Sequence, residues 1–515
     1  MPKWFDDAVF YEIYPCSFQD SNGDGYGDIQ GIISRLEYIK EIGFNAIWLN
    51  PIFRSPFMDG GYDVSDFFDI DPRFGTRKDA EELLKKAHNL GIRIILDLVA
   101  GHASEQHPLF LKSAEPTRNE YSDLFVWNNS PWDKPQGWWQ FISGRYDRHA
   151  NYMVNFFSCQ PAFNYGWNEI KYPDWQMHYK DPRCKQARDY LKSIIRFWLD
   201  KGFDGFRVDM ADSLIKGDDD KVATIELWQE IRHEIFDNEY PEAVLVSEWS
   251  DHEKSLRAGF HGDFYLDHYG NGYNRLFRYI KNDVNYSFFN GTGDIASFLS
   301  DYMPRFHIAN HHGGHVCFIS GNHDSFRIGS NGYTERMLRL MHSFLLTMPG
   351  VPFVYNGDEI GMDYMHGLPS KEGGFQRTGS RTPMQWDSSV NMGFSTASKE
   401  NLYLPLNYDK PVNVEEQLTR SDSLLRTIKD IIALRKEYKG LRSRCFEVIY
   451  AEPHAYPFVY GREDIIVMVN PSAHSRRISG DYYNLKSLYN IGEVNLNGSY
   501  LEMSPWSFAI YKKEV

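Results

Sequence analysis

Short apolar segments typical of buried strands alternate along the chain with segments of helical spacing. The first apolar segment spans residues 9–14 and is followed by a helical segment at residues 29–42. Further strands are predicted at residues 45–49, 92–99, 205–208, 244–247, 263–266, 316–319 and 352–355, with further helices at residues 79–90, 186–201, 224–236 and 423–438. Eight such strands with intervening helices predict an α/β fold, a (β/α)8 TIM barrel.

The alternation stops after the third predicted strand. Residues 103–173 are aromatic, irregular and rich in Asn and Pro, so we expect an inserted loop-rich domain there. The segment 441–515 carries short alternating apolar runs and an Asn-Gly turn, which favours a C-terminal β-sandwich-like domain. The predicted barrel therefore comprises residues 1–102 and 174–440.

The charge of the chain argues against a nucleic-acid partner, because a formal net charge of -15 offers no basic surface for phosphates. No segment is long and apolar enough to span a membrane, and the first residues lack the apolar core of a signal peptide. We therefore expect a cytoplasmic protein without a membrane partner; the oligomeric state is not indicated. Aromatic residues make up 16% of the chain. A single aromatic residue, such as Trp138 or Trp139, is more often part of a core, but a surplus of aromatic residues in loops also suits stacking on sugar rings.

An acidic, glycine-rich loop follows the first predicted strand, at residues 20–28. Residues with oxygen atoms stand at alternate positions, as in calcium-binding loops. The expected ligands are the side chains of Asp20, Asn22, Asp24 and Asp28 and the carbonyl of Tyr26. An EF-hand would carry Glu where Gly31 stands, so the alternatives are a different structural calcium site or an acidic surface turn.

Charged residues follow several of the predicted strands at the end where barrel enzymes place their chemistry. The fourth strand leads into Arg207 and Asp209, the fifth into Glu248, and the seventh into His323 and Asp324. Two carboxylates flanking one bond are what glycoside hydrolysis needs. An Arg207–Asp209 pair alone could be structural, but the further carboxylates favour a catalytic site.

The surroundings of the two carboxylates assign them different roles. Arg207 lies two residues before Asp209 on the same strand face, so we expect it to keep Asp209 ionised as a nucleophile. Glu248 follows an apolar strand and precedes Trp249, so we expect burial to raise its pKa, as suits a general acid.

These segments resemble the signature regions of the α-amylase family, glycoside hydrolase family 13, and within it the oligo-1,6-glucosidase and α-glucosidase branch. The similar motifs are residues 9–15, the loop 20–28, Gly61-Tyr62-Asp63, residues 381–387 and residues 413–417.

The resemblance implies a retaining mechanism with a covalent glycosyl-enzyme on Asp209. Glu248 would act as acid and then as base, and Asp324 would stabilise the transition state. The resemblance further implies substrate-binding roles for Tyr62, Asp63, His102, Arg207, His323 and Arg377, with Arg381 as an alternative to Arg377. In the family the acidic loop binds calcium or sometimes magnesium.

The function that we expect is an exo-acting α-glucosidase on short α-linked gluco-oligosaccharides, with α-1,4 or α-1,6 preference or both. A transglucosylase or isomerase (trehalose synthase-like or sucrose phosphorylase-like) and an endo-acting α-amylase are the alternatives on the same scaffold. Met210 and Phe326 depart from the family pattern near the leaving-group side, so the aglycone specificity stays open. A non-catalytic transporter subunit is disfavoured, because such proteins lack the catalytic carboxylates.

Overall fold

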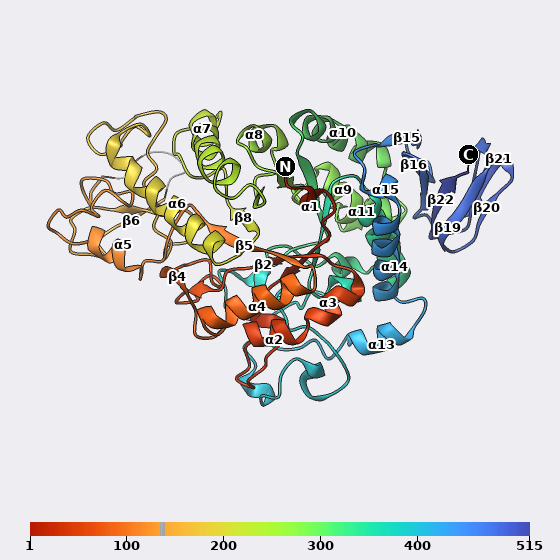
Figure 1. Cartoon of the computed structure of the whole chain (residues 1–515), viewed down its shortest axis with the longest axis horizontal. Coiled ribbons are helices and arrows are strands. Elements are labelled where there is room, and N and C mark those ends of the chain that lie inside the picture. The colour runs from red at the N-terminus through yellow and green to blue at the C-terminus, as the bar shows by residue number, and fades with distance from the viewer. Residues whose placement is uncertain (134, 136–139, 515) are drawn as a thin grey trace.

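The computed structural model describes residues 1–133, 135 and 140–514. At its centre lies a closed barrel of parallel strands, surrounded by helices (Figure 1). Around the barrel the strands follow the order β1 (Phe10–Ile13), β2 (Ala46–Leu49), β5 (Arg93–Val99), β8 (Gly205–Asp209), β9 (Val244–Ser247), β10 (Gly262–Phe264), β13 (His315–Ile319) and β14 (Val351–Tyr355). Each lies where the sequence predicts a strand, so the predicted TIM barrel is confirmed.

The helices pack their apolar faces against the outside of the barrel. The main ones are α4 (Arg77–Asn89), α6 (Lys185–Asp200), α7 (Val222–Ile231), α8 (His252–Arg257), α10 (Ile295–His312), α11 (Glu335–Thr347) and α14 (Leu424–Glu437). At the start of α4, two side chains of the local sequence determine where the helix begins. The Thr76 hydroxyl accepts from the Asp79 N–H and the Asp79 carboxylate accepts from the Thr76 N–H, which satisfies two otherwise unpaired donors.

The single helix predicted over residues 29–42 is wrong, because the structure has α2 (Ile29–Ser34) and α3 (Leu36–Ile42). Arg35 between them leaves the helical conformation, with φ -109° and ψ 5°. Its Nε donates to Gln19 Oε1 at 2.8 Å, and its guanidinium lies 4.1 Å from the ring centre of Trp386. These contacts accompany the interruption of the helix at Arg35. The apolar residues keep their helical spacing across this point, so the sequence pattern does not show the interruption.

The inserted region between β5 and β8 contains little regular structure, as predicted. Its elements are α5 (Pro108–Ser113), β6 (Phe141–Ile142) and β7 (Tyr152–Met153). The irregular chain continues past residue 173 as far as the short helix η2 (Pro182–Cys184). Aromatic packing holds this region together, for example Phe110 stacked on Trp127 with ring centres 5.6 Å apart. Trp138 and Trp139 lie outside the described residues.

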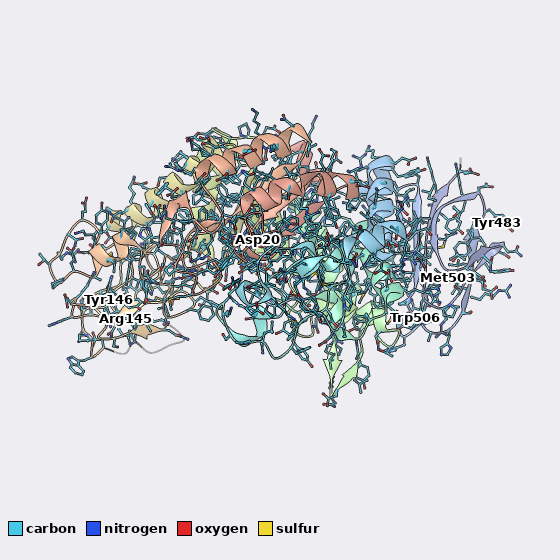
Figure 2. The ribbon with its side chains drawn as sticks, turned by 90° about the horizontal axis from the view of Figure 1, so that it is seen from below. Asp20, Arg145, Tyr146, Tyr483, Met503 and Trp506 are labelled. Atoms are coloured by element: carbon cyan, nitrogen blue, oxygen red, sulfur yellow. The ribbon has the colours of Figure 1, made fainter. Side chains whose placement is uncertain are left out.

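The C-terminal part is all β, as predicted. Its elements are β15 (Glu447–Tyr450), β16 (Phe458–Arg462), β17 (Ile465–Asn470), β18 (Arg476–Tyr482), β19 (Leu485–Ile491), β20 (Val494–Leu496), β21 (Gly498–Met503) and β22 (Ser507–Lys513). They form sheets of five and three strands around a small core that includes Met468 and Leu501. Figure 2 shows Met503 and Tyr483 of this part at the opposite end of the molecule from Arg145 and Tyr146 of the insertion.

Two short antiparallel pairs extend the loops between barrel elements: β3 (Phe53–Arg54) with β4 (Asp66–Ile70), and β11 (Ile280–Lys281) with β12 (Val284–Asn285). Among the residues that the structure describes, none of the helices combines the length and apolarity needed to cross a bilayer. The cytoplasmic location stays a prediction.

Candidate active site

A buried guanidinium, that of Arg207, organises the carboxylates at the carboxyl ends of three neighbouring barrel strands. Its Nη1 lies 2.9 Å from Asp97 Oδ1 on β5 and 3.2 Å from Asp209 Oδ1 on β8. Its Nη2 lies 2.7 Å from Oε1 of Glu248, the residue after β9. Glu248 Oε2 also accepts from the N–H of Met210 at 3.0 Å. The two residues expected to be nucleophile and acid therefore contact the same cation.

The protonation of this cluster follows from its charge count, since one guanidinium faces three carboxylates. Burial raises the pKa of Asp209 well above its ordinary value, and Arg207 acts in the opposite direction without reversing the shift. Burial raises the pKa of Asp97 as well. These shifts run against the expectation that Arg207 holds Asp209 ionised, and the ionised state of Asp209 stays a prediction.

Asp324 lies across from this cluster and is held by two further arginines. Its Oδ1 lies 2.8 Å from Arg381 Nη2 and 3.2 Å from Arg377 Nε. Burial opposes ionisation, but the positive charges around the carboxylate outweigh it, so the pKa of Asp324 is below its ordinary value. Arg381 is fully buried, whereas 19% of the Arg377 side chain is exposed. Of the two, Arg377 is thus the one that a ligand could contact.

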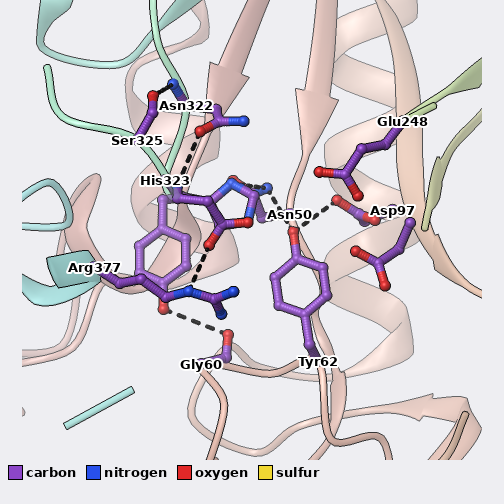
Figure 3. Close-up of polar contacts among 12 residues, drawn as sticks. Asn50, Gly60, Tyr62, Asp97, Glu248, Asn322, His323, Ser325 and Arg377 are labelled. Atoms are coloured by element: carbon purple, nitrogen blue, oxygen red, sulfur yellow. Dashed lines mark hydrogen bonds and ion pairs between the residues drawn. The ribbon is translucent and has the colours of Figure 1, made fainter. Parts of the chain in front are cut away.

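Tyr62 and His102, to which the resemblance gives substrate-binding roles, lie beside these charges. The Tyr62 hydroxyl donates to Asp97 Oδ2 at 2.9 Å and accepts from Asn50 Nδ2 at 3.2 Å (Figure 3). The His102 Nε2 lies 3.1 Å from the carbonyl of Tyr62. Burial lowers the pKa of His102 to about 3, so this ring is neutral.

Asp63 does not lie where the resemblance implies. Its side chain is fully buried, and its two oxygens accept from the Ser55 hydroxyl and from the N–H groups of Met58 and Asp59. These hydrogen bonds fix the conformation of the loop, so the role of the Asp63 side chain is to stabilise the loop.

Besides Asp324, Arg377 contacts the carboxylate of Asp59, which the sequence reasoning missed. Asp59 Oδ1 lies 2.9 Å from Arg377 Nη1, and burial raises the pKa of Asp59 to about 7. The signal was present in the sequence, because Asp59 precedes Tyr62 by three residues in the same short motif.

The predicted metal loop is hydrogen-bonded to itself. Asp20 Oδ1 accepts from the N–H of Asn22 and of Gly23, and Asp20 Oδ2 accepts from the N–H of Gly25 and the Ser395 hydroxyl. Asp28 accepts from the Ser21 hydroxyl and N–H, and it caps α2 through the N–H of Gly31. Asn22 and Asp24 accept from the N–H groups of Asp24 and Tyr26. In the described part of the chain, no three His, Cys, Asp or Glu side chains converge as metal ligands.

Comparison with known proteins agrees with this geometry. The family described as "Alpha amylase, catalytic domain" matches residues 12–444. An oligo-1,6-glucosidase from Parageobacillus thermoglucosidasius is 30% identical, over 99% of this chain and 99% of the relative. An α-glucosidase from Apis mellifera is 32% identical, over 84% of this chain and 78% of the relative. The solved structure of the trehalulose synthase MutB from Pseudomonas mesoacidophila MX-45 superimposes with a TM-score of 0.82 and 25% identity, over 99% of this chain and 100% of that one.

A barrel of this topology with Asp209, Glu248 and Asp324 at its carboxyl edge defines the glycoside-hydrolase class of site. The chain belongs to the α-amylase family, glycoside hydrolase family 13, and its relatives place it in the predicted oligo-1,6-glucosidase and α-glucosidase branch.

Proposed function

We propose that this glycosidase is a retaining, exo-acting α-glucosidase that releases glucose from short α-linked gluco-oligosaccharides. The observation that carries the proposal is the placement of Asp209 and Glu248 on neighbouring strands, in contact with one guanidinium. The residues Val208 and Ser247 that precede them are paired in the parallel register of β8 and β9. Because paired strands lie about 4.8 Å apart, the two carboxyl groups are suited to the short separation of retaining enzymes.

In the proposed reaction, Asp209 attacks the anomeric carbon while Glu248 gives its proton to the leaving glycosidic oxygen. A covalent glucosyl ester on Asp209 and a free shortened sugar result. Glu248, now ionised, takes a proton from water as the water oxygen attacks the same carbon. The ester bond breaks, glucose leaves, and both carboxyl groups return to their starting states.

The exo-acting assignment is supported by the group of charges on the far side of Tyr62. Arg377 joins Asp59 to Asp324, so donors and acceptors for several sugar hydroxyls stand together at one point. Buried polar groups of this kind discriminate strongly in favour of a ligand that pairs them. A terminal glucose residue keeps free the one hydroxyl that a chain-internal residue has used in its linkage. The names of the two curated relatives support the same substrate class.

Product analysis by chromatography tests the proposal. The protein is incubated separately with maltose, isomaltose, maltoheptaose, soluble starch, trehalose and sucrose, with calcium present. Glucose released from the disaccharides, with starch nearly untouched, is the expected result, and the faster disaccharide gives the linkage preference. A mixture of maltodextrins from starch would instead mean an endo-acting amylase.

The second candidate is a transglucosylase or isomerase. It is favoured by the structural similarity to a trehalulose synthase over the whole chain. The covalent intermediate would be the same, and the difference would lie in whether water or a sugar hydroxyl attacks it. In the same experiment, new disaccharides without net glucose would establish this function in place of hydrolysis.

We also propose that the loop 20–28 holds a structural calcium ion, with magnesium as the alternative cation. The residue types fit a hard cation, since Asp20, Asn22, Asp24 and Asp28 supply oxygens and Tyr26 a carbonyl. A cation would take the places of the Ser21 and Ser395 hydroxyls at the carboxylates, and both hydroxyls can rotate away. The ion would stabilise the loop without entering the reaction.

A further inference from the structure

Glu12 lies inside the barrel on β1 and contacts His323, one of the predicted substrate-binding residues. The Glu12 side chain is fully buried, and its Oε1 lies 2.8 Å from His323 Nδ1. The imidazole of His323 is stacked between Tyr14 and Tyr62, with interplanar angles of 9° and 8°. Its orientation is therefore fixed, and only its tautomer remains to be decided.

The hydrogen bonds around His323 favour one tautomer of its ring. The Tyr62 hydroxyl has one proton and gives it to Asp97 Oδ2, so it must accept from Asn50. The amide nitrogen of Asn50 therefore faces both the Tyr62 hydroxyl and His323 Nδ1, which lies 3.1 Å away. The N–H group of Asn50 favours Nδ1 as an acceptor and places the ring proton on Nε2; the alternative is an Nδ1–H group that donates to a Glu12 carboxylate.

The same hydrogen bonds favour a neutral Glu12. Since Nδ1 of His323 carries no proton in this tautomer, the short contact with Glu12 Oε1 requires the carboxyl group to donate. Among the described residues, Glu12 Oε2 has no hydrogen-bond partner, which is costly for a buried carboxylate and tolerable for a neutral acid. Burial raises the pKa of Glu12 well above its ordinary value and lowers that of His323 well below its own, in agreement with a neutral pair.

We propose that Glu12 is a positioning residue that, as a neutral carboxylic acid, holds the proton of His323 on Nε2. This nitrogen lies 3.3 Å from Asp324 Oδ2 at the side of the site where the substrate is expected. Among the described residues Nε2 has no hydrogen-bond partner, so its proton would be directed to a sugar hydroxyl beside Asp324. The expected effect of Glu12 on turnover rests on the proposed glycosidase function. The expected proton positions on Glu12 and His323 do not depend on it.

Neutron diffraction from a deuterium-exchanged crystal of the protein tests the proton positions directly. Deuterium on Glu12 Oε1 and on His323 Nε2 is expected. Deuterium on His323 Nδ1 would overturn the proposal. Because this measurement needs no turnover, it stands even if the protein hydrolyses no α-glucoside, an outcome that would count against the proposed function alone.

Kinetics of Glu12 variants test the consequence. Glu12→Gln keeps an N–H donor of the same shape, so kcat/KM should stay within about twofold of the parent and the pH profile should be unchanged. Glu12→Leu removes the donor, and we expect kcat to fall about 10- to 100-fold with a smaller change in KM. A Glu12→Leu variant with parental kcat, or a Glu12→Gln variant as impaired as Glu12→Leu, would overturn the proposal.

The pH profile is informative because the pair sits among several ionisable groups. Those around Glu12 and His323 are Tyr14, Tyr62, Asp97, Arg207, Asp324, Tyr355, Arg377 and Arg381. If Glu12 were ionised in the native protein, Glu12→Gln would remove a negative charge from this group and shift the acid limb. An unshifted limb is the expected result.

The matched control is Glu359, another fully buried carboxyl group of the barrel. It accepts from the hydroxyls of Tyr11 and Tyr38 and does not touch the catalytic residues described above. Glu359→Leu should lower the thermal stability while leaving kcat of the folded protein unchanged. A loss of kcat equal to that of Glu12→Leu would mean that any buried carboxyl group has this effect and would overturn the specific role of Glu12. Should Glu12→Leu fail to fold, Glu12→Gln and the neutron data still decide the question.

Discussion

Two regions of the molecule concentrate carboxylates in a short space, the cluster around Arg207 and the loop 20–28. In the cluster, Asp97, Asp209 and Glu248 come from different strands and turn toward one guanidinium. In the loop, Asp20 and Asp28 turn toward N–H groups of their own segment and toward serine hydroxyls.

The comparison shows that acidic residues alone do not define reactivity. In the loop, neighbouring N–H groups pair with the carboxylates and fix the loop conformation, which the proposed calcium ion would further stabilise. In the cluster, three carboxylates share one cation at low dielectric, so small changes in position or charge shift the proton among them. The four predictions below test this difference, beginning with the largest expected effect.

Asp209→Asn should lower kcat/KM by roughly four orders of magnitude, because the amide cannot form the covalent ester. The assay is hydrolysis of the best disaccharide, with circular dichroism to show that the fold is kept. A suitable control is Asp212→Asn, since Asp212 pairs with Lys221 and is 39% exposed. Equal activities of the two variants would remove Asp209 from the mechanism.

Arg207→Met should lower the free energy of unfolding by about 3–5 kcal/mol, because it leaves buried carboxylates without their cation. Denaturant titration at pH 7 measures the loss. Arg207→Lys, which keeps a positive charge, should lose less. The difference in free energy of unfolding between the parent protein and Arg207→Met should become smaller as the pH falls, because the carboxylates then take up protons. A stability equal to that of the parent protein would show that the cluster is not held by Arg207.

Asp59→Asn should change how stability depends on pH. The pKa of Asp59 is raised to about 7 in the folded protein, against roughly 3.9 when unfolded. Between these values the folded state holds a proton that the unfolded state releases, so this group's contribution to stability falls as the pH rises from about 4 to 7. The variant lacks this loss of stability, so relative to the parent its free energy of unfolding should rise by up to about 4 kcal/mol over that pH range. Asp189→Asn, at an exposed surface pair, should show no such gain.

Calcium should raise the melting temperature by a few degrees, about 2–4 °C for a chain of this size, and a chelator should remove the gain. Asp24→Ala should abolish the response while leaving kcat nearly unchanged. Asp283→Ala, in the turn between β11 and β12, serves as the control and should respond as the parent does. A melting temperature independent of calcium would mean that the loop is an acidic turn without a metal.

Local patterns predicted much of the fold. Period-two and period-3.6 spacing located each barrel strand and the helices α4, α6, α7 and α14, because those patterns arise from which face is buried. No helix was predicted at α8, α10 or α11. The single helix expected over residues 29–42 failed at Arg35, where contacts with Gln19 and Trp386 accompany a break that the spacing does not show. Asp59 was missed and Asp63 misplaced, because the five-residue segment 59–63 alone does not tell which of its two carboxylates turns toward Arg377.

By itself, the sequence determined the barrel, its insertion, the all-β C-terminal part, and the strands whose ends carry Arg207, Asp209, Glu248 and Asp324. These are consequences of periodicity and of the strand order that parallel pairing permits. Only the tertiary structure decided which atoms face one another. Arg207 draws together carboxylates from three strands, Arg377 meets Asp59 and not Asp63, and Glu12 meets His323 from the opposite part of the chain. Hydrogen bonds and ion pairs depend on distances of a few ångströms between residues far apart in sequence, and folding alone sets those distances.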